Sequence, residues 1–229
     1  MRWGSVYMSS KQESKAKKHG AIKQASRKAI HDGQSSASCD AKAISCEERI
    51  YGFEPFVPEG AKVLILGSMP SVKSLEQGFY YAHPQNRMFK LIARYLSLYN
   101  HSSVEKVVPL VSVSDRKAAL TTLGIAMWDT VDSCVRNGSL DSNIKVATYA
   151  DIASLLKKHG SIRCVITAGG FAAKAFKKST LSLEEVKTGK LVFDYHALPS
   201  TSPANTVSFE KLCEAYDAVI LPHLGIKVG

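Results

Sequence analysis

The sequence has few cysteines, no long apolar run and fewer acidic than basic residues, and the first two shortages exclude whole classes of protein. Five cysteines in 229 residues, none in a C-x-x-C pair, argue against a disulfide scaffold and against a zinc or iron–sulfur cluster. Apolar runs such as 63–66 and 164–166 are far too short to span a bilayer. A hydrophobic content of 45% excludes a wholly disordered chain. A soluble, intracellular α/β protein remains, with a formal net charge of +10.

The positive charge is concentrated near the N-terminus. Residues 1–50 hold ten Lys and Arg against five Asp and Glu, which is half of the net charge in about a fifth of the chain. Since this stretch is rich in Ser and Lys and has no apolar periodicity, we predict a basic, disordered tail over 1–45 and a single domain over 46–229. The tail lacks the apolar region of a secretory signal. Three interpretations of the tail stay open: a transit peptide, a DNA tether and a start site assigned too far upstream. We expect the protein to be cytoplasmic if it is bacterial, and nuclear or organellar if it is eukaryotic.

Short apolar runs alternate with helical patterns along the rest of the chain. Strands that alternate with helices predict a parallel sheet covered on both faces, a three-layer α/β/α sandwich with a short central parallel sheet. The predicted strands are 61–67, 162–167 and 191–198, and the predicted helices are 86–100, 115–123, 151–159, a stretch ending at 178, and 208–221.

This topology predicts where ligands bind. In open parallel sheets the binding crevice lies beyond the C-terminal ends of the strands. Three segments follow the predicted strands, and we expect 67–71, 168–170 and 199–205 to converge there.

The segment after the first strand carries the most informative side chains. Two tyrosines, Tyr80 and Tyr81, are followed by His83 and by the carboxamide of Asn86 at the start of a helix. An aromatic ring beside an amide can stack on a flat heterocycle and hydrogen-bond its edge. Core packing of the aromatic pair and helix capping by Asn86 are the alternatives.

The later two segments offer groups that can hold phosphate oxygens. LPSTSPAN, residues 198–205, places hydroxyls and backbone N–H groups between a strand and a helix, although an ordinary Ser/Pro turn has the same composition. Gly169 can bring a backbone N–H to a phosphate or can allow close helix–strand packing.

Four motifs in this order resemble one known family. GSMPS, GFYYAHPQNRMF, GIAMWDTVDSC with GSLDSNIK, and LPSTSPAN are similar to the uracil-DNA glycosylase superfamily, and most similar to its hypoxanthine-DNA glycosylase branch, over roughly residues 50–224. Met69 stands where mismatch-specific uracil glycosylases have the Asn that positions water. The hypoxanthine branch instead uses an Asn farther along, which corresponds to Asn86, 19 residues after Gly67.

The resemblance implies a monofunctional glycosylase that flips a deaminated base out of double-stranded DNA and removes it, as a monomer, without metal, cofactor or strand cleavage. It implies that Asn86 is catalytic and that Tyr81 stacks on the base, whose edge the backbone around Gly67, Ser68 and Met69 reads. The DNA-binding residues that it implies are Ser71, His83, Gly169, Ser200, Thr201, Ser202 and Asn205.

The same residues are compatible with other functions. A mismatch-specific uracil glycosylase and a non-catalytic DNA-binding module stay open, whereas a serine hydrolase would need a G-x-S-x-G elbow that GSMPS does not supply. His83 and His196 flank the first and last motifs without a nearby set of Cys or carboxylate ligands, which makes a poor metal site. Asp129 and Asp132 can act as a base, but a capped loop around Trp128 is the favoured interpretation.

Overall fold

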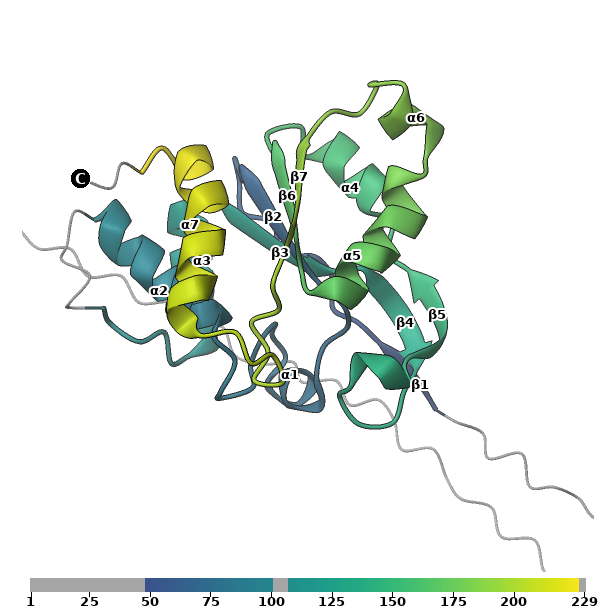
Figure 1. Ribbon diagram of the computed structural model, residues 1–229, viewed down its shortest axis with the longest axis horizontal. Coiled ribbons are helices and arrows are strands. Elements are labelled where there is room, and N and C mark those ends of the chain that lie inside the picture. The colour runs from purple at the N-terminus through teal and green to yellow at the C-terminus, as the bar shows by residue number, and fades with distance from the viewer. Residues whose placement is uncertain (1–47, 101–106, 227–229) are drawn as a thin grey trace, which may run out of the picture. The chain divides into compact units, whose positions relative to one another are not determined.

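Four parallel strands form the central sheet, in the order β3-β2-β6-β7 (Figure 1). The structure is a computed structural model that describes residues 48–100 and 107–226. The strands are β2 (Val63–Gly67), β3 (Ile125–Asp129), β6 (Cys164–Ala168) and β7 (Asp194–Leu198). Every residue of β2 is buried, as expected for a central strand that is covered on both faces.

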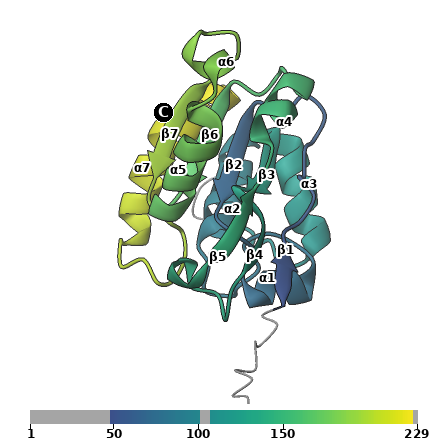
Figure 2. The ribbon, with the colours of Figure 1, turned by 90° about the vertical axis from the view of Figure 1, so that its right-hand side faces the viewer.

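Helices cover both faces of this sheet, which confirms the predicted three-layer sandwich (Figures 1 and 2). Because side chains alternate along a strand, Val63 and Ile65 face one core and Leu64 and Leu66 face the other. The first core is completed by α2 (Met88–Tyr99), α3 (Val113–Leu123) and α7 (Phe209–Leu224), and the second by α4 (Ile152–Lys158) and α5 (Gly170–Phe176).

A second sheet, which the sequence analysis did not predict, extends from the end of β3. Its three antiparallel strands have the order β1-β4-β5, with β1 at Arg49–Tyr51, β4 at Val131–Val135 and β5 at Lys145–Tyr149. No residue of β5 is fully buried, and its pairing with β4 contains register shifts. A partly exposed, irregular strand lacks the alternating apolar pattern that reveals a strand in a sequence.

The predicted capped loop around Trp128 is wrong, because Trp128 and Asp129 are the last two residues of β3. The indole N–H of Trp128 donates to the Phe53 carbonyl oxygen, 2.9 Å away. Strand β3, with the sequence IAMWD, was not predicted because it contains one β-branched residue, and β-branched residues are a main sequence signal of a strand.

Several boundaries also differ from the prediction. Strands β2 and β7 begin two and three residues later than expected, and α7 continues through Pro222 to Leu224, where Gly225 ends it in the left-handed conformation. The expected loop after GSMPS contains the short helix α1 (Val72–Gln77), capped by the Ser71 hydroxyl. Three short elements complete the chain: η2 (Asp141–Asn143), the π-helical η3 (Lys177–Leu181) and α6 (Glu184–Lys187).

The described residues all belong to one unit, Ser45–Gly229. The predicted tail, 1–45, lies outside the described residues and stays a prediction. Within 48–100 and 107–226, no helix is both long and apolar enough to cross a membrane.

Candidate active site

A cavity of about 380 Å³ lies at the C-terminal ends of the central strands. All three segments that the topology predicted to converge contribute to its wall, so that prediction is confirmed. Its lining includes Gly67–Ser71 after β2, Asp129 at the end of β3, Ala168 at the end of β6, and Ser200, Ser202 and Asn205 after β7, together with Tyr81 and Asn86.

Asn86 is held in place by two hydrogen bonds to its amide oxygen. Its Oδ1 accepts the backbone N–H of Met88 and the hydroxyl of Thr201, each at 2.9 Å. The first bond satisfies the N–H of the first residue of α2. The N-cap of α2 is Arg87, so the alternative interpretation of Asn86 as the N-cap is wrong. The second bond joins two segments 115 residues apart. Within the described residues Nδ2 has no protein partner, so the amide N–H₂ remains as a donor for a ligand.

Arg87, which the sequence analysis did not single out, fastens the loop after β7 to the start of α2. Its guanidinium donates to the carbonyl oxygens of Ser202 and Asn205, both at 2.9 Å, to that of Thr201 at 3.4 Å, and to that of Val207. Its backbone N–H also donates to the Thr201 carbonyl, at 3.0 Å. One rigid five-donor group therefore sets the position of this loop beside Asn86.

The two tyrosines have different environments. Tyr80 is a core residue: its ring packs edge-on against Phe53 and Phe79, and its hydroxyl donates to the Glu54 carbonyl at 2.7 Å. Tyr81 lines the cavity, has a positive φ of 50°, and buries a hydroxyl that has no hydrogen-bond partner within 48–100 and 107–226. A left-handed aromatic residue is strained, and such strain concentrates at functional sites.

The backbone of GSMPS comes close to neighbouring side chains. A Cβ at Gly67 would lie 2.3 Å from Oδ1 of Asp129 and 3.1 Å from the Tyr81 hydroxyl, so only glycine fits there. The Ser68 hydroxyl donates to Oδ1 of Asp141 at 2.6 Å. The Met69 side chain is buried beside Val131, which leaves the backbone as the part that a ligand can contact.

Asp129 lines the cavity but was interpreted as part of a loop. The residue is 4% exposed, and its Oδ2 is buried without a hydrogen-bond partner in the part of the chain that the structure describes. The pKa of Asp129 is raised to about 7: burial is the largest cause, nearby Asp141 adds to the rise, and Arg136 opposes it. Asp129 was missed because β3 was not predicted as a strand. In the parallel pairing of β2 and β3, Asp129 lies beside Gly67.

Comparison with known proteins identifies the family. The profile of the Uracil DNA glycosylase superfamily matches residues 54–221. The chain belongs to this superfamily. The matched range includes every segment that lines the cavity.

Similar proteins of the superfamily come from two archaea. A Methanosarcina barkeri protein named hypoxanthine DNA glycosylase is 28% identical over 155 residues, which cover 60% of this chain and 93% of the relative. A protein of the same name from Methanosarcina acetivorans is 27% identical over 154 residues, with 67% and 87% covered. The solution NMR structure of a candidate uracil DNA glycosylase from M. acetivorans superposes with a TM-score of 0.59 at 24% identity, covering 78% of this chain and 99% of that one, and it supports the fold.

The predicted DNA-binding residues occupy different places in and around the cavity. Ser71, Ser200, Ser202 and Asn205 line the cavity. Thr201 is buried, and its hydroxyl is directed to Asn86. Asn205 braces its own loop, because Nδ2 donates to the Ser200 carbonyl and Oδ1 accepts the N–H of Val207.

Two further predicted residues lie outside the cavity wall. His83 lines a neighbouring hollow of about 740 Å³, to which Tyr81 and Asn86 also contribute. Gly169 has a φ of 108°, and a Cβ there would lie 3.0 Å from that of Ser200. Close packing therefore requires glycine at this position.

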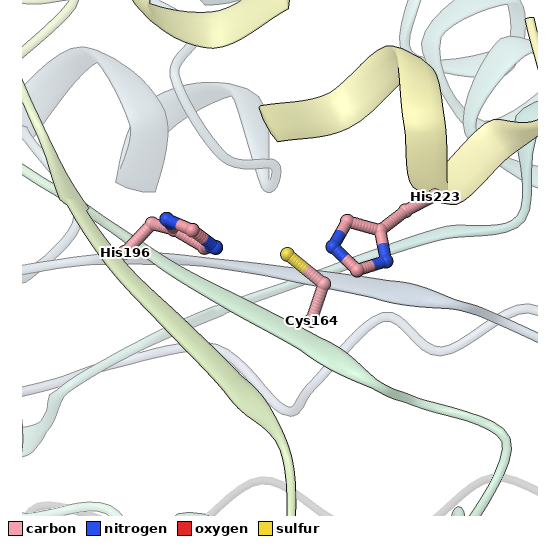
Figure 3. Close-up of side chains that lie close together, drawn as sticks. All are labelled: Cys164, His196 and His223. Carbon is pink, nitrogen blue, oxygen red and sulfur yellow. The ribbon is translucent and has the colours of Figure 1, made fainter. Parts of the chain in front are cut away.

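One cluster away from the cavity has metal-ligating side chains. Cys164, His196 and His223 place their ligand atoms within 4.8 Å of one another on the face of the sheet that α7 covers (Figure 3). Ligands of a tetrahedral zinc ion lie about 3.3–3.8 Å apart, so separations of up to 4.8 Å would have to shrink. Burial raises the pKa of the Cys164 thiol to about 12, which disfavours the thiolate that a metal needs.

Proposed function

We propose that this chain is a monofunctional DNA glycosylase that removes hypoxanthine from deoxyinosine in double-stranded DNA. The observation that carries the proposal is the position of Asn86, which the H-P-x-N stretch delivers to the cavity while Met69 replaces the Asn of the mismatch-specific motif. The relatives named hypoxanthine DNA glycosylase support the choice of base.

Binding requires the damaged nucleotide to leave the duplex stack. The flipped base enters the cavity, the Tyr81 ring stacks on its face, and backbone groups of Ser68 and Met69 read its edge. Near the rim of this cavity the hydroxyls of Ser71, Ser200 and Ser202 hold phosphate oxygens. We expect the protein to act as a monomer, because one flipped nucleotide needs one cavity.

Asn86 acts as a hydrogen-bond donor during bond breaking. Since Oδ1 already accepts two hydrogen bonds, Nδ2 is the group that meets the substrate. An amide does not take up a proton near neutral pH, so its contribution is to position the substrate and to stabilise charge on the departing base. No lysine lines the cavity within the described residues, which supports hydrolysis without a Schiff-base lyase step.

A panel of lesions tests the proposal. The protein is incubated with duplexes that contain one deoxyinosine or one uracil, and abasic sites are then cleaved with alkali. We expect cleavage at deoxyinosine that depends on alkali. No product from any lesion would refute the glycosylase proposal, and excision from G:U alone would replace hypoxanthine by uracil as the substrate.

Thr201→Val is expected to slow excision of hypoxanthine about 10- to 100-fold, because the loss of one hydroxyl frees the Asn86 amide to rotate. Single-turnover rates on the deoxyinosine duplex measure the effect. Thr201→Ser keeps the hydroxyl and should stay close to the parent rate. Equal rates for the valine variant and the parent would show that this hydrogen bond does not position Asn86.

Removal of residues 1–45 is expected to weaken DNA binding and to leave excision intact. Residues 1–45 hold nine Lys and Arg against three Asp and Glu, so their removal takes away +6 of the formal net charge of +10. The truncated chain therefore makes fewer phosphate contacts, and its affinity should fall less steeply as salt is raised. Fluorescence anisotropy at several salt concentrations gives the slope. An unchanged slope, or loss of single-turnover excision, would contradict the tail's role as a tether.

A further inference from the structure

Asp129 lines the cavity with a buried carboxyl oxygen that lacks a hydrogen-bond partner among the described residues. Two carboxyl groups line the cavity, and that of Asp141 accepts the hydroxyl of Ser68. Asp129 is 4% exposed, its Oδ2 has no hydrogen-bond partner in the described part of the chain, and its Oδ1 lies against Gly67 at the end of the neighbouring strand. A buried polar atom without a partner is costly, and at a binding site it is typical of a group that meets the ligand.

Burial favours the neutral form of Asp129, and the charged groups around it act in both directions. Asp141 in η2 adds negative charge, and the Arg136 guanidinium at the end of β4 adds positive charge. The Tyr81 hydroxyl lies beside Asp129 at Gly67, whereas that of Tyr80 donates to the Glu54 carbonyl. Burial together with Asp129 raises the pKa of both phenols, so both stay uncharged. Because burial outweighs Arg136 and raises its pKa to about 7, Asp129 holds a proton in much of the protein at neutral pH.

We propose that Asp129 is the general acid of the reaction and gives its proton to N7 of the departing purine. This inference rests on the proposed function. As the C1′–N9 bond breaks, its electron pair stays on the base and the Asp129 proton goes to N7. A water oxygen bonds to C1′, and the proton that the water loses goes to the Asp129 carboxylate, which restores the acid.

The acceptor atoms of hypoxanthine favour a carboxylic acid over an ionised carboxylate at this position. N7 and O6 of hypoxanthine are acceptors, which an ionised carboxylate would repel and a carboxylic acid can meet. Protonation of the leaving group removes the need for it to depart as an anion, and general acids contribute about 10²- to 10⁴-fold. The acid therefore complements Asn86, which can donate a hydrogen bond but gives up no proton.

The test is single-turnover excision by the parent and Asp129→Asn between about pH 5.5 and pH 8.5. We expect the parent rate to fall as the pH rises above about 7, and Asp129→Asn to be at least about 100-fold slower at pH 6 with a flat profile. Asp132→Asn, a matched change at an exposed residue of β4, should keep the parent's rate and profile. A parent-like profile for Asp129→Asn would overturn the general acid.

A substrate change identifies the atom that is protonated. With 7-deazadeoxyinosine, which lacks N7, the parent should lose most of its advantage over Asp129→Asn. An equally large effect of the substitution on both substrates would overturn protonation at N7. Failure of the parent to excise hypoxanthine at all would instead refute the proposed function, so the two failures are distinguishable.

Thermal unfolding gives a readout that does not depend on activity. A folded-state pKa raised from 3.8 to about 7 means that the parent loses stability as the pH rises through this interval, whereas Asn does not titrate. We therefore expect the melting temperature of Asp129→Asn, relative to the parent, to increase from pH 5 to pH 8. A constant difference would show that Asp129 ionises normally and would overturn the proposal.

Discussion

Asn86→Ala is expected to lower the single-turnover rate of hypoxanthine excision at least about 1,000-fold, which corresponds to about 4 kcal/mol of transition-state stabilisation. The substitution removes Nδ2, the amide donor left for the substrate, and also the oxygen that accepts the Met88 N–H. The rate is measured with enzyme in excess on a deoxyinosine duplex, and melting temperatures show whether the fold persists.

Two variants separate the parts of this effect. Asn86→Asp keeps the oxygen that accepts the Met88 N–H and the Thr201 hydroxyl but has no Nδ2, so we expect a loss nearly as large as with alanine. Met69→Ala removes a side chain that packs beside Val131 and should leave much of the activity. Comparable rates for Asn86→Ala and the parent would refute the assignment, and an active Asn86→Asp would move the role to Oδ1.

Arg87→Lys is expected to lower both stability and activity, although the charge is kept. The Arg87 guanidinium donates to four carbonyl oxygens. A lysine ammonium has three N–H donors on one nitrogen atom, so it cannot donate to all four. Carbonyls left without their donors cost about 2–4 kcal/mol of unfolding free energy in total. Because the loop would then shift relative to Asn86, excision should fall about 10- to 100-fold as well.

Urea unfolding and single-turnover excision measure these two effects of Arg87→Lys. Arg94→Lys is the matched control: Arg94 forms an ion pair with Asp217, at 2.7 Å, which a lysine can also form, so we expect a change below about 1 kcal/mol. A stable Arg87→Lys variant with parental activity would show that the loop holds its position without the guanidinium.

The sequence by itself determined the layered fold and the main wall of the site. Runs such as 63–66 are apolar at every position, and such runs alternating with helices leave few arrangements other than a covered parallel sheet. Parallel strands end at one edge, so the convergence of 67–71 with 199–205 follows from chain order alone. The motifs carried the resemblance to the superfamily, and they pointed to Asn86 before its surroundings were known.

Tertiary structure alone decided how those residues are held. The bonds from Thr201 to Asn86 and from Arg87 to the loop after β7 join residues more than 100 positions apart, and no local pattern encodes such a pairing. Asp129 shows the reason most clearly. Its burial and its position against Gly67 depend on the register of β3 beside β2, so the same carboxyl group that a loop would leave in water becomes an unpaired acid inside the cavity.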